Sequence, residues 1–343
     1  MIKKHFFFTF LLLMGSVISF TSCSSSDDDG DNGTLDPPAY KSSSALYQVT
    51  SSNSKYSSIE FTESGSYIVV AKSAINHAMQ NTEGKKFSFA MAPWVEASTR
   101  ATTSGNIITG KYTVDGNKYI LEGFGTITVN TSGDTTVSLE IAETGSDPYT
   151  LTAAKKNQMP GSEQTDKLCR SWKVASLGMK ASFNVEGAQS FNFDKTVEGG
   201  NIAELMATFY TDMLNWAANI SRQYGEEIPQ DMLNKQIEEQ KKKIYKAYTT
   251  FESVIFSQAG TYMVTYGNGT LAVATWAWKD NSNSVLQYSW NYANMNASGA
   301  SGECGIQFKG SKCIMTENQS ANNIDTIVKG ADMTMTYTLE EIK

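Results

Sequence analysis

One cysteine, Cys23, stands where a covalent modification is expected. The chain opens with Lys3 and Lys4, continues with an apolar run over 6–18, and reaches Cys23 after small polar residues. A basic start, a short apolar middle and small residues before the cut make a secretory signal. A spanning helix needs about 20 apolar residues, and this run is shorter. We therefore expect residues 1–22 to be removed just before Cys23; the alternative is an ordinary signal peptide with a chance cysteine.

Catalytic chemistry has little support in the remaining residues. His77 is the only histidine after the signal segment, and no serine-nucleophile, zinc-protease or paired-cysteine metal motif occurs. The adjacent carboxylates Glu226-Glu227 and Glu340-Glu341 are expected to face solvent. We predict a protein that is not an enzyme and that carries no metal or cofactor.

Three further cysteines, Cys169, Cys304 and Cys313, leave disulfide pairing open. An exported protein can form disulfides. A two-residue hairpin loop at 310–311 would pair Phe308 with Cys313 and leave Cys304 out of register. Cys169 could pair with either of the others, and one thiol must stay free.

Aromatic side chains on two neighbouring predicted strands are the best candidates for ligand contact. Flat rings stack against sugars and enclose apolar ligands, but the inward face of a small barrel is either packed core or cavity wall. A further tryptophan lies in a predicted loop. The predicted ligand-binding residues are Trp276, Trp278, Tyr288, Trp290, Tyr292 and Trp94.

An internal repeat identifies the elements that would position these side chains. Residues 59–69 match residues 254–264, and 47–51 match 172–176, in the same order. Each copy predicts an opening strand and then a hairpin, with Gly65 or Gly260 supplying the positive φ of a tight turn. Alternating apolar residues on both arms require a core on one sheet face.

Further short strands follow in each half, punctuated by turn residues. Their number predicts a mainly β protein with two tandem lipocalin-like antiparallel β-barrels or sandwiches. We place the first domain at 41–156, a linker at 157–167 and the second domain at 168–343. The predicted strands are 107–114, 118–122, 125–129, 135–141 and 149–153 in the first half, and 271–279, 285–292, 305–308, 312–316 and 333–339 in the second.

The second half contains an insertion, at about 200–248, that the first half lacks. Apolar residues recur at helical spacing over 202–220. Gly225 is a plausible stop, and Pro229 suits the first turn of a second helix. The pattern predicts a helical hairpin packed on the second barrel, either as structural decoration or as a lid or docking element.

Short motifs at the start of the chain and in the barrels resemble those of Bacteroidota surface lipoproteins. Phe20-Thr21-Ser22-Cys23 resembles a lipobox, although Phe20 replaces the usual leucine, and the acidic, non-apolar stretch after Cys23 resembles their surface-export signal. The 61–67 and 256–262 hairpins, with 110–114 followed by 118–121, resemble lipocalin-like domains of that group. The resemblance implies a lipid anchor in the outer membrane, facing the exterior, with 23–40 as an acidic tether.

The mature chain would hold 26 basic and 35 acidic residues, a net charge of −9. An acidic surface argues against nucleic acid and anionic membranes as partners. The leading hypothesis is a surface-anchored, non-enzymatic binding protein for a glycan or a small apolar ligand. The alternative is a structural or interaction subunit whose helical insertion docks a protein partner in the outer membrane.

Overall fold

The computed structural model describes most of the chain beyond residue 34. The described residues are 35–73, 107–131, 135–185, 187, 189–223, 225, 227–290, 301–322 and 328–343. Cys23, His77, Trp94 and Tyr292 lie outside them. Among the described helices, none combines the length and apolar character needed to cross a membrane.

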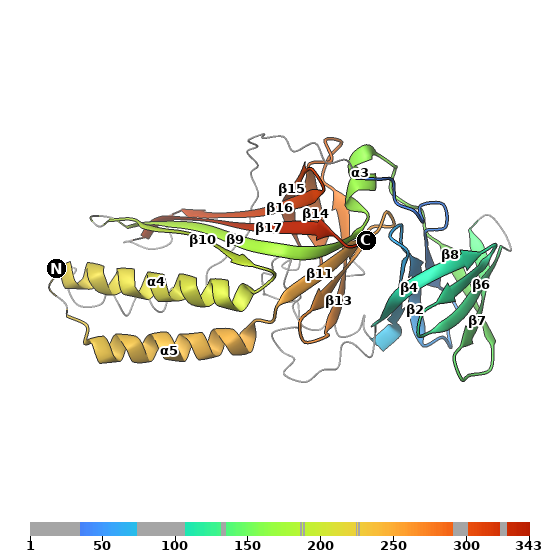
Figure 1. Cartoon of the computed structure of the whole chain (residues 1–343), viewed down its shortest axis with the longest axis horizontal. Helices are drawn as coiled ribbons and strands as arrows, with labels where there is room; N and C mark the ends of the chain where they lie inside the picture. The colour runs from blue at the N-terminus through green and yellow to red at the C-terminus, as the bar shows by residue number, and fades with distance from the viewer. Residues whose placement is uncertain are drawn as a thin grey trace.

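The first eight strands close into an antiparallel barrel (Figure 1). Each strand pairs with the next along the chain, and β1 closes the ring by pairing with β8. A two-residue turn joins β4 to β5, where Asp115 faces Lys118 and Gly116 has φ +60°, whereas the four residues 62–65 join β2 to β3. The strands are β1 (Ala45–Val49), β2 (Tyr56–Phe61), β3 (Ser66–Ala71), β4 (Ile107–Asp115), β5 (Lys118–Leu121), β6 (Gly125–Thr131), β7 (Thr136–Glu143) and β8 (Tyr149–Lys155).

The second barrel closes in the same way through one long strand, β9, which pairs with β11 on one side and β17 on the other. Strand β10 pairs only with the far part of β9, outside the closed ring. The prediction of two tandem β-barrels is confirmed. The strands are β9 (Ser171–Val185), β10 (Phe191–Glu198), β11 (Phe251–Phe256), β12 (Thr261–Tyr266), β13 (Leu271–Trp278), β14 (Val285–Ser289), β15 (Ser301–Lys309), β16 (Lys312–Asn322) and β17 (Val328–Glu341).

A helical hairpin covers the part of β9, β10 and β17 that extends past the second barrel (Figure 1). It consists of α4 (Ile202–Gln223) and α5 (Gln230–Ala247), with Pro229 at the N-cap of α5, as the apolar spacing predicted. The ring of Phe209 on α4 lies 5.3 Å from that of Phe193 on β10. The long strands therefore have a buried face beyond the barrel because α4 supplies a second apolar layer.

The segment predicted as a linker contains a short helix, α3 (Glu163–Leu168). Ser162 caps it, since its hydroxyl oxygen accepts a hydrogen bond from the Thr165 amide at 3.1 Å. The helix is anchored on both sides. Lys41 forms an ion pair with Asp166 at 2.6 Å, and the Trp278 indole donates to the Thr165 hydroxyl. Tertiary contacts therefore order a segment whose sequence suggested only a break in the strand pattern.

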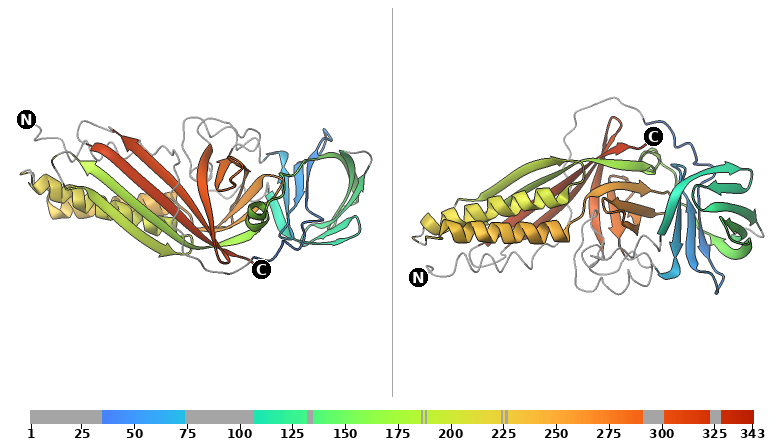
Figure 2. Two further views of the ribbon diagram at one scale, coloured as in Figure 1. Left: turned by 90° about the horizontal axis from the view of Figure 1, so that it is seen from above. Right: turned by 60° about the horizontal axis from the view of Figure 1, so that its bottom comes forward.

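The two copies of the repeat pack against each other where the barrels meet (Figure 2). The outer faces of β3 and β12 form a small apolar cluster in which Ile68 and Met263, equivalent residues of the two copies, are both buried. Glu63 and Gln258 are a second equivalent pair. They are joined directly, because the backbone amide of Gln258 donates a hydrogen bond to the Glu63 carboxylate at 3.2 Å. Both faces of these hairpins are therefore buried, whereas their alternation predicted a core on one face only.

Candidate functional site

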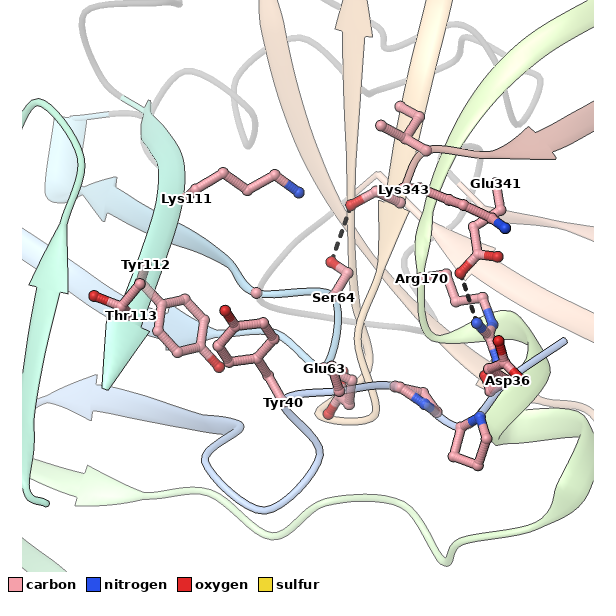
Figure 3. Close-up of a pocket in the computed structure, with 16 residues that line it drawn as sticks. Asp36, Tyr40, Glu63, Ser64, Lys111, Tyr112, Thr113, Arg170, Glu341 and Lys343 are labelled. Carbon is pink, nitrogen blue, oxygen red and sulfur yellow. Dashed lines mark hydrogen bonds and ion pairs between the residues drawn. The ribbon is translucent and has the colours of Figure 1, made fainter. Parts of the chain in front are cut away.

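A pocket of about 480 Å³ lies at the edge of the junction between the barrels (Figure 3). Five parts of the chain line it: residues 36–40 ahead of β1, the β2–β3 turn, strand β4, residues 170–171 at the start of β9, and residues 341–343 at the end of β17. Its volume falls within the roughly 300–1,000 Å³ of small-molecule sites. Neither barrel could form this pocket alone, since each contributes only part of its wall.

Tyr40 is half-buried and supplies the aromatic surface of the pocket; its ring packs edge-on against the buried ring of Tyr112, with centroids 5.1 Å apart. The Tyr112 hydroxyl donates to the Thr62 carbonyl at 3.0 Å, which holds its ring in place. Tyr40 lies across Gly65, where φ is +74° and an added Cβ would stand 2.6 Å from the Tyr40 ring. Glycine is thus required twice at this turn, for its backbone angle and for the close approach of the ring.

The opposite wall is polar and is supplied by the second barrel. Arg170 is 4% exposed and is held by three acceptors. It donates to the Glu341 carboxylate at 2.6 Å, to the Lys167 carbonyl at 3.1 Å and to the backbone oxygen of Asp36. Because most donors of the Arg170 guanidinium are already used, this side chain holds the surrounding chain in position and has few N–H groups left for a ligand.

Two side chains link the barrels across the pocket floor, and Figure 3 shows this contact beside Lys111. The Ser171 hydroxyl lies 2.9 Å from that of Ser64. Lys111, on β4, extends its amine toward the space between the walls, and it forms no ion pair with any described residue. The pocket therefore offers aromatic, hydroxyl and amine groups together.

Burial shifts the pKa values of two carboxyl groups beside the pocket. Desolvation raises the pKa of Glu63, opposed by hydrogen bonds from its own backbone and from Ser44 and Gln258. Behind it, Glu60 is 1% exposed, and desolvation raises its pKa to about 7 against hydrogen bonds from Ser257 and Thr261. These shifts come from packing at the junction.

Four of the predicted ligand-binding residues come together in the second barrel. Trp276 and Tyr288 are cross-strand partners on β13 and β14. Trp276, Tyr288 and Trp290 are at most 2% exposed and belong to the core, whereas Trp278 is half-buried and packs against it. The Trp276 indole donates to the Ser257 carbonyl at 3.0 Å. Of the two alternatives that the sequence left open, this burial favours packed core for Trp276, Tyr288 and Trp290.

A buried carboxylate lies among these rings. Glu317, on β16, is 1% exposed and accepts hydrogen bonds from the hydroxyls of Tyr288, at 2.6 Å, and Tyr337. Cys304 is buried beside it, and desolvation with the charge of Glu317 raises the pKa of the Cys304 thiol well above its usual range. A thiol that resists ionisation is a poor nucleophile, so this cluster stabilises the barrel interior and does not resemble a catalytic site.

The structure also shows where the cysteines lie and whether side chains of the types that bind metals gather together. Cys169, Cys304 and Cys313 are buried and unpaired, and Phe308 faces Cys313 across the turn at 310–311, as predicted. Within the described ranges, no three His, Cys, Asp or Glu side chains gather in a way that could hold a metal ion.

No protein-family model and no curated protein matches this chain. The site must therefore be interpreted from its own geometry. Sequence reasoning did not select Tyr40, Lys111 or Arg170 as site residues, because they lie in three segments with no shared motif. The one available signal was the repeat: its Gly65 turn marks the hairpin on which the pocket is built.

Proposed function

We propose that this chain is a lipid-anchored, cell-surface binding protein without catalytic activity, and that its ligand occupies the junction pocket. The observation that carries the proposal is the pocket itself, which has the half-buried Tyr40 ring, supported from behind by Tyr112, on one side and polar groups opposite. The anchor and the surface location rest on the Cys23 signal and the acidic tether.

A glycan is the ligand class that this wall favours over an apolar molecule. Sugars present hydroxyls to polar partners and C–H faces to aromatic rings. Lys111, Ser64 and Thr113 line the pocket beside the tyrosines. An apolar ligand would cover the Lys111 amine and the Thr113 hydroxyl without replacing their hydrogen bonds to water, at a cost of about 1–3 kcal/mol each. The volume of about 480 Å³ suits one or two sugar rings better than a long polymer.

Substitution in the pocket tests this proposal. We expect Tyr40→Ala and Lys111→Ala each to weaken binding of a glycan, identified by screening neutral and acidic oligosaccharides, by about tenfold, or 1.4 kcal/mol. Isothermal titration on the folded chain measures the change. Lys118→Ala removes an exposed lysine from β5 in the same barrel and should leave affinity unaltered.

The same screen includes fatty acids and tetrapyrroles. A ligand at 100 times its dissociation constant should add about 2.7 kcal/mol to the free energy of unfolding. Binding that survives both pocket substitutions but is lost with Trp278→Ala would move the site to the second barrel.

The second candidate function is an interaction subunit, and two exposed apolar side chains on α5 favour it. Tyr245 is 57% exposed and Met232 is 37% exposed on this helix. Deleting the hairpin would uncover the core beneath α4, so point substitution is the cleaner test. Recovery of an outer-membrane protein partner that falls with Tyr245→Ser, but not with Lys111→Ala, would support docking through α5.

A further inference from the structure

The junction between the barrels contains an ionisable group where its repeat equivalent is apolar. Glu60 on β2 corresponds to Ile255 on β11, and both lie beside the apolar cluster that joins the barrels. The interface therefore contains a carboxyl group from one copy of the repeat, whereas the other copy contributes a hydrocarbon side chain at the equivalent position.

In the closed junction, hydrogen bonds satisfy only part of the buried carboxyl group of Glu60. One carboxyl oxygen accepts a hydrogen bond from the Ser257 hydroxyl of the second barrel. The other oxygen is buried and has no hydrogen-bond partner. A buried carboxylate with an unmet oxygen is costly, and the cost is relieved either by protonation or by admitting water.

The groups that face Glu60 among the described residues do not neutralise it. From the second barrel come the hydroxyls of Ser257 and Thr261, and from its own hairpin comes the acidic Glu63. Cys169, whose thiol pKa is raised by burial and by Glu63, Asp166 and Glu60, lies on the α3 side. The nearby cation, Lys41, is already paired with Asp166 at 2.6 Å.

We infer that the junction is a proton-dependent joint, closed while Glu60 holds its proton and loosened when Glu60 ionises. Loosening would admit water to Glu60 and separate the outer faces of β3 and β12. Ser64 and Ser171, whose hydroxyls meet at 2.9 Å, line the pocket from the two barrels, so the same movement would disrupt the pocket. That consequence for the ligand rests on the proposed function, whereas the joint itself does not.

The sign of the effect follows from linkage. Glu60 titrates near its ordinary value of 4.5 when water reaches it, and near 7 in the closed junction. The closed form therefore binds the proton more tightly, and its advantage falls as pH rises between these values. The equilibrium constant for opening should rise about tenfold per pH unit in that window and level off above it.

Hydrogen exchange, corrected for the pH dependence of intrinsic exchange, measures the joint without any ligand. In the wild type, the backbone amide of Gln258, which donates to the Glu63 carboxylate across the junction, should lose protection between pH 5 and 7, while the amides of β6 and β7 keep theirs. Glu60→Gln, and Glu60→Ile as the repeat's own alternative, should abolish this pH dependence. Glu140→Gln removes an exposed carboxylate from β7 and should retain the wild-type profile.

An unchanged pH profile in both Glu60 variants would overturn the inference, as would parallel loss of protection in β6 and β7, which indicates global unfolding. Should the variants not fold, carbon NMR titration of the Glu60 carboxyl in the wild type decides: a midpoint near 7 supports the joint, and one below 5 refutes it. A working joint with no glycan binding would refute the proposed function alone; glycan binding with no joint would refute only this inference.

Discussion

We expect Trp276→Ala to lower the free energy of unfolding by about 3–5 kcal/mol, the usual cost of removing a large buried aromatic side chain. Trp276 is 2% exposed, and its ring packs edge-on against Phe256 and Trp278. Its indole also donates to the carbonyl of Ser257, the residue whose hydroxyl holds Glu60. Guanidinium unfolding followed by fluorescence and circular dichroism measures the loss.

Trp278→Ala is the matched control on the same strand. Trp278 is half-buried and contacts the Thr165 hydroxyl through its indole, so its removal should cost roughly half as much or less. A stability loss below 1 kcal/mol for Trp276→Ala would contradict the core assignment. Combined with lost ligand binding, it would restore Trp276 to the role that its sequence position suggested.

Gly200→Ala should be the most damaging change of a single methyl group in the second barrel. Gly200 lies between β10 and α4, and its carbonyl accepts hydrogen bonds from the amides of Phe251 and Ile202. An added Cβ would stand 1.5 Å from the Phe251 carbonyl oxygen. The carbonyl oxygen belongs to the main chain and the Cβ is attached directly to it, so neither can move aside as the end of a side chain can. We therefore expect the free energy of unfolding to fall by about 3 kcal/mol.

Gly199→Ala provides the comparison, because Gly199 has φ +61° but open space around its Cβ position. Its cost should be the backbone strain alone, about 1–2 kcal/mol. Chemical denaturation of both variants separates the two effects. Equal losses would mean that α4 and β11 can shift apart freely at this point, against the close approach described above.

The fold was largely predictable because its signals are local. Alternation and turn glycines identified most strands to within a few residues, and the Gly225 and Pro229 positions delimited the two helices. Strand β10 and the outer parts of β9, β16 and β17 were missed. Their partners are one another and α4, and no local pattern distinguishes a strand that ends at a barrel rim from one that continues beyond it.

The candidate pocket could not be predicted in this way. Tyr40, Lys111 and Arg170 are distant in sequence and meet only because two barrels pack through their repeated hairpins. The aromatic strands illustrate the complementary difficulty. The sequence placed Trp276 and Tyr288 on neighbouring strands correctly, but alternation is the same whether the inward face fills a core or lines a cavity.

The sequence by itself determined the repeat, two tandem β-domains, the helical hairpin and the expectation of a lipid anchor at Cys23, since each depends on spacing within a short segment. It left barrels and sandwiches as alternatives, and the structure decided for barrels. Only the tertiary structure decided which outer faces of the barrels are also buried, because the other barrel covers them. Glu60 alternates outward from its own barrel and would be solvated there, yet it is buried because a second barrel covers it. Burial of a charge is set by all surrounding atoms, and those around Glu60 include Ser257, which is 197 positions away in the chain.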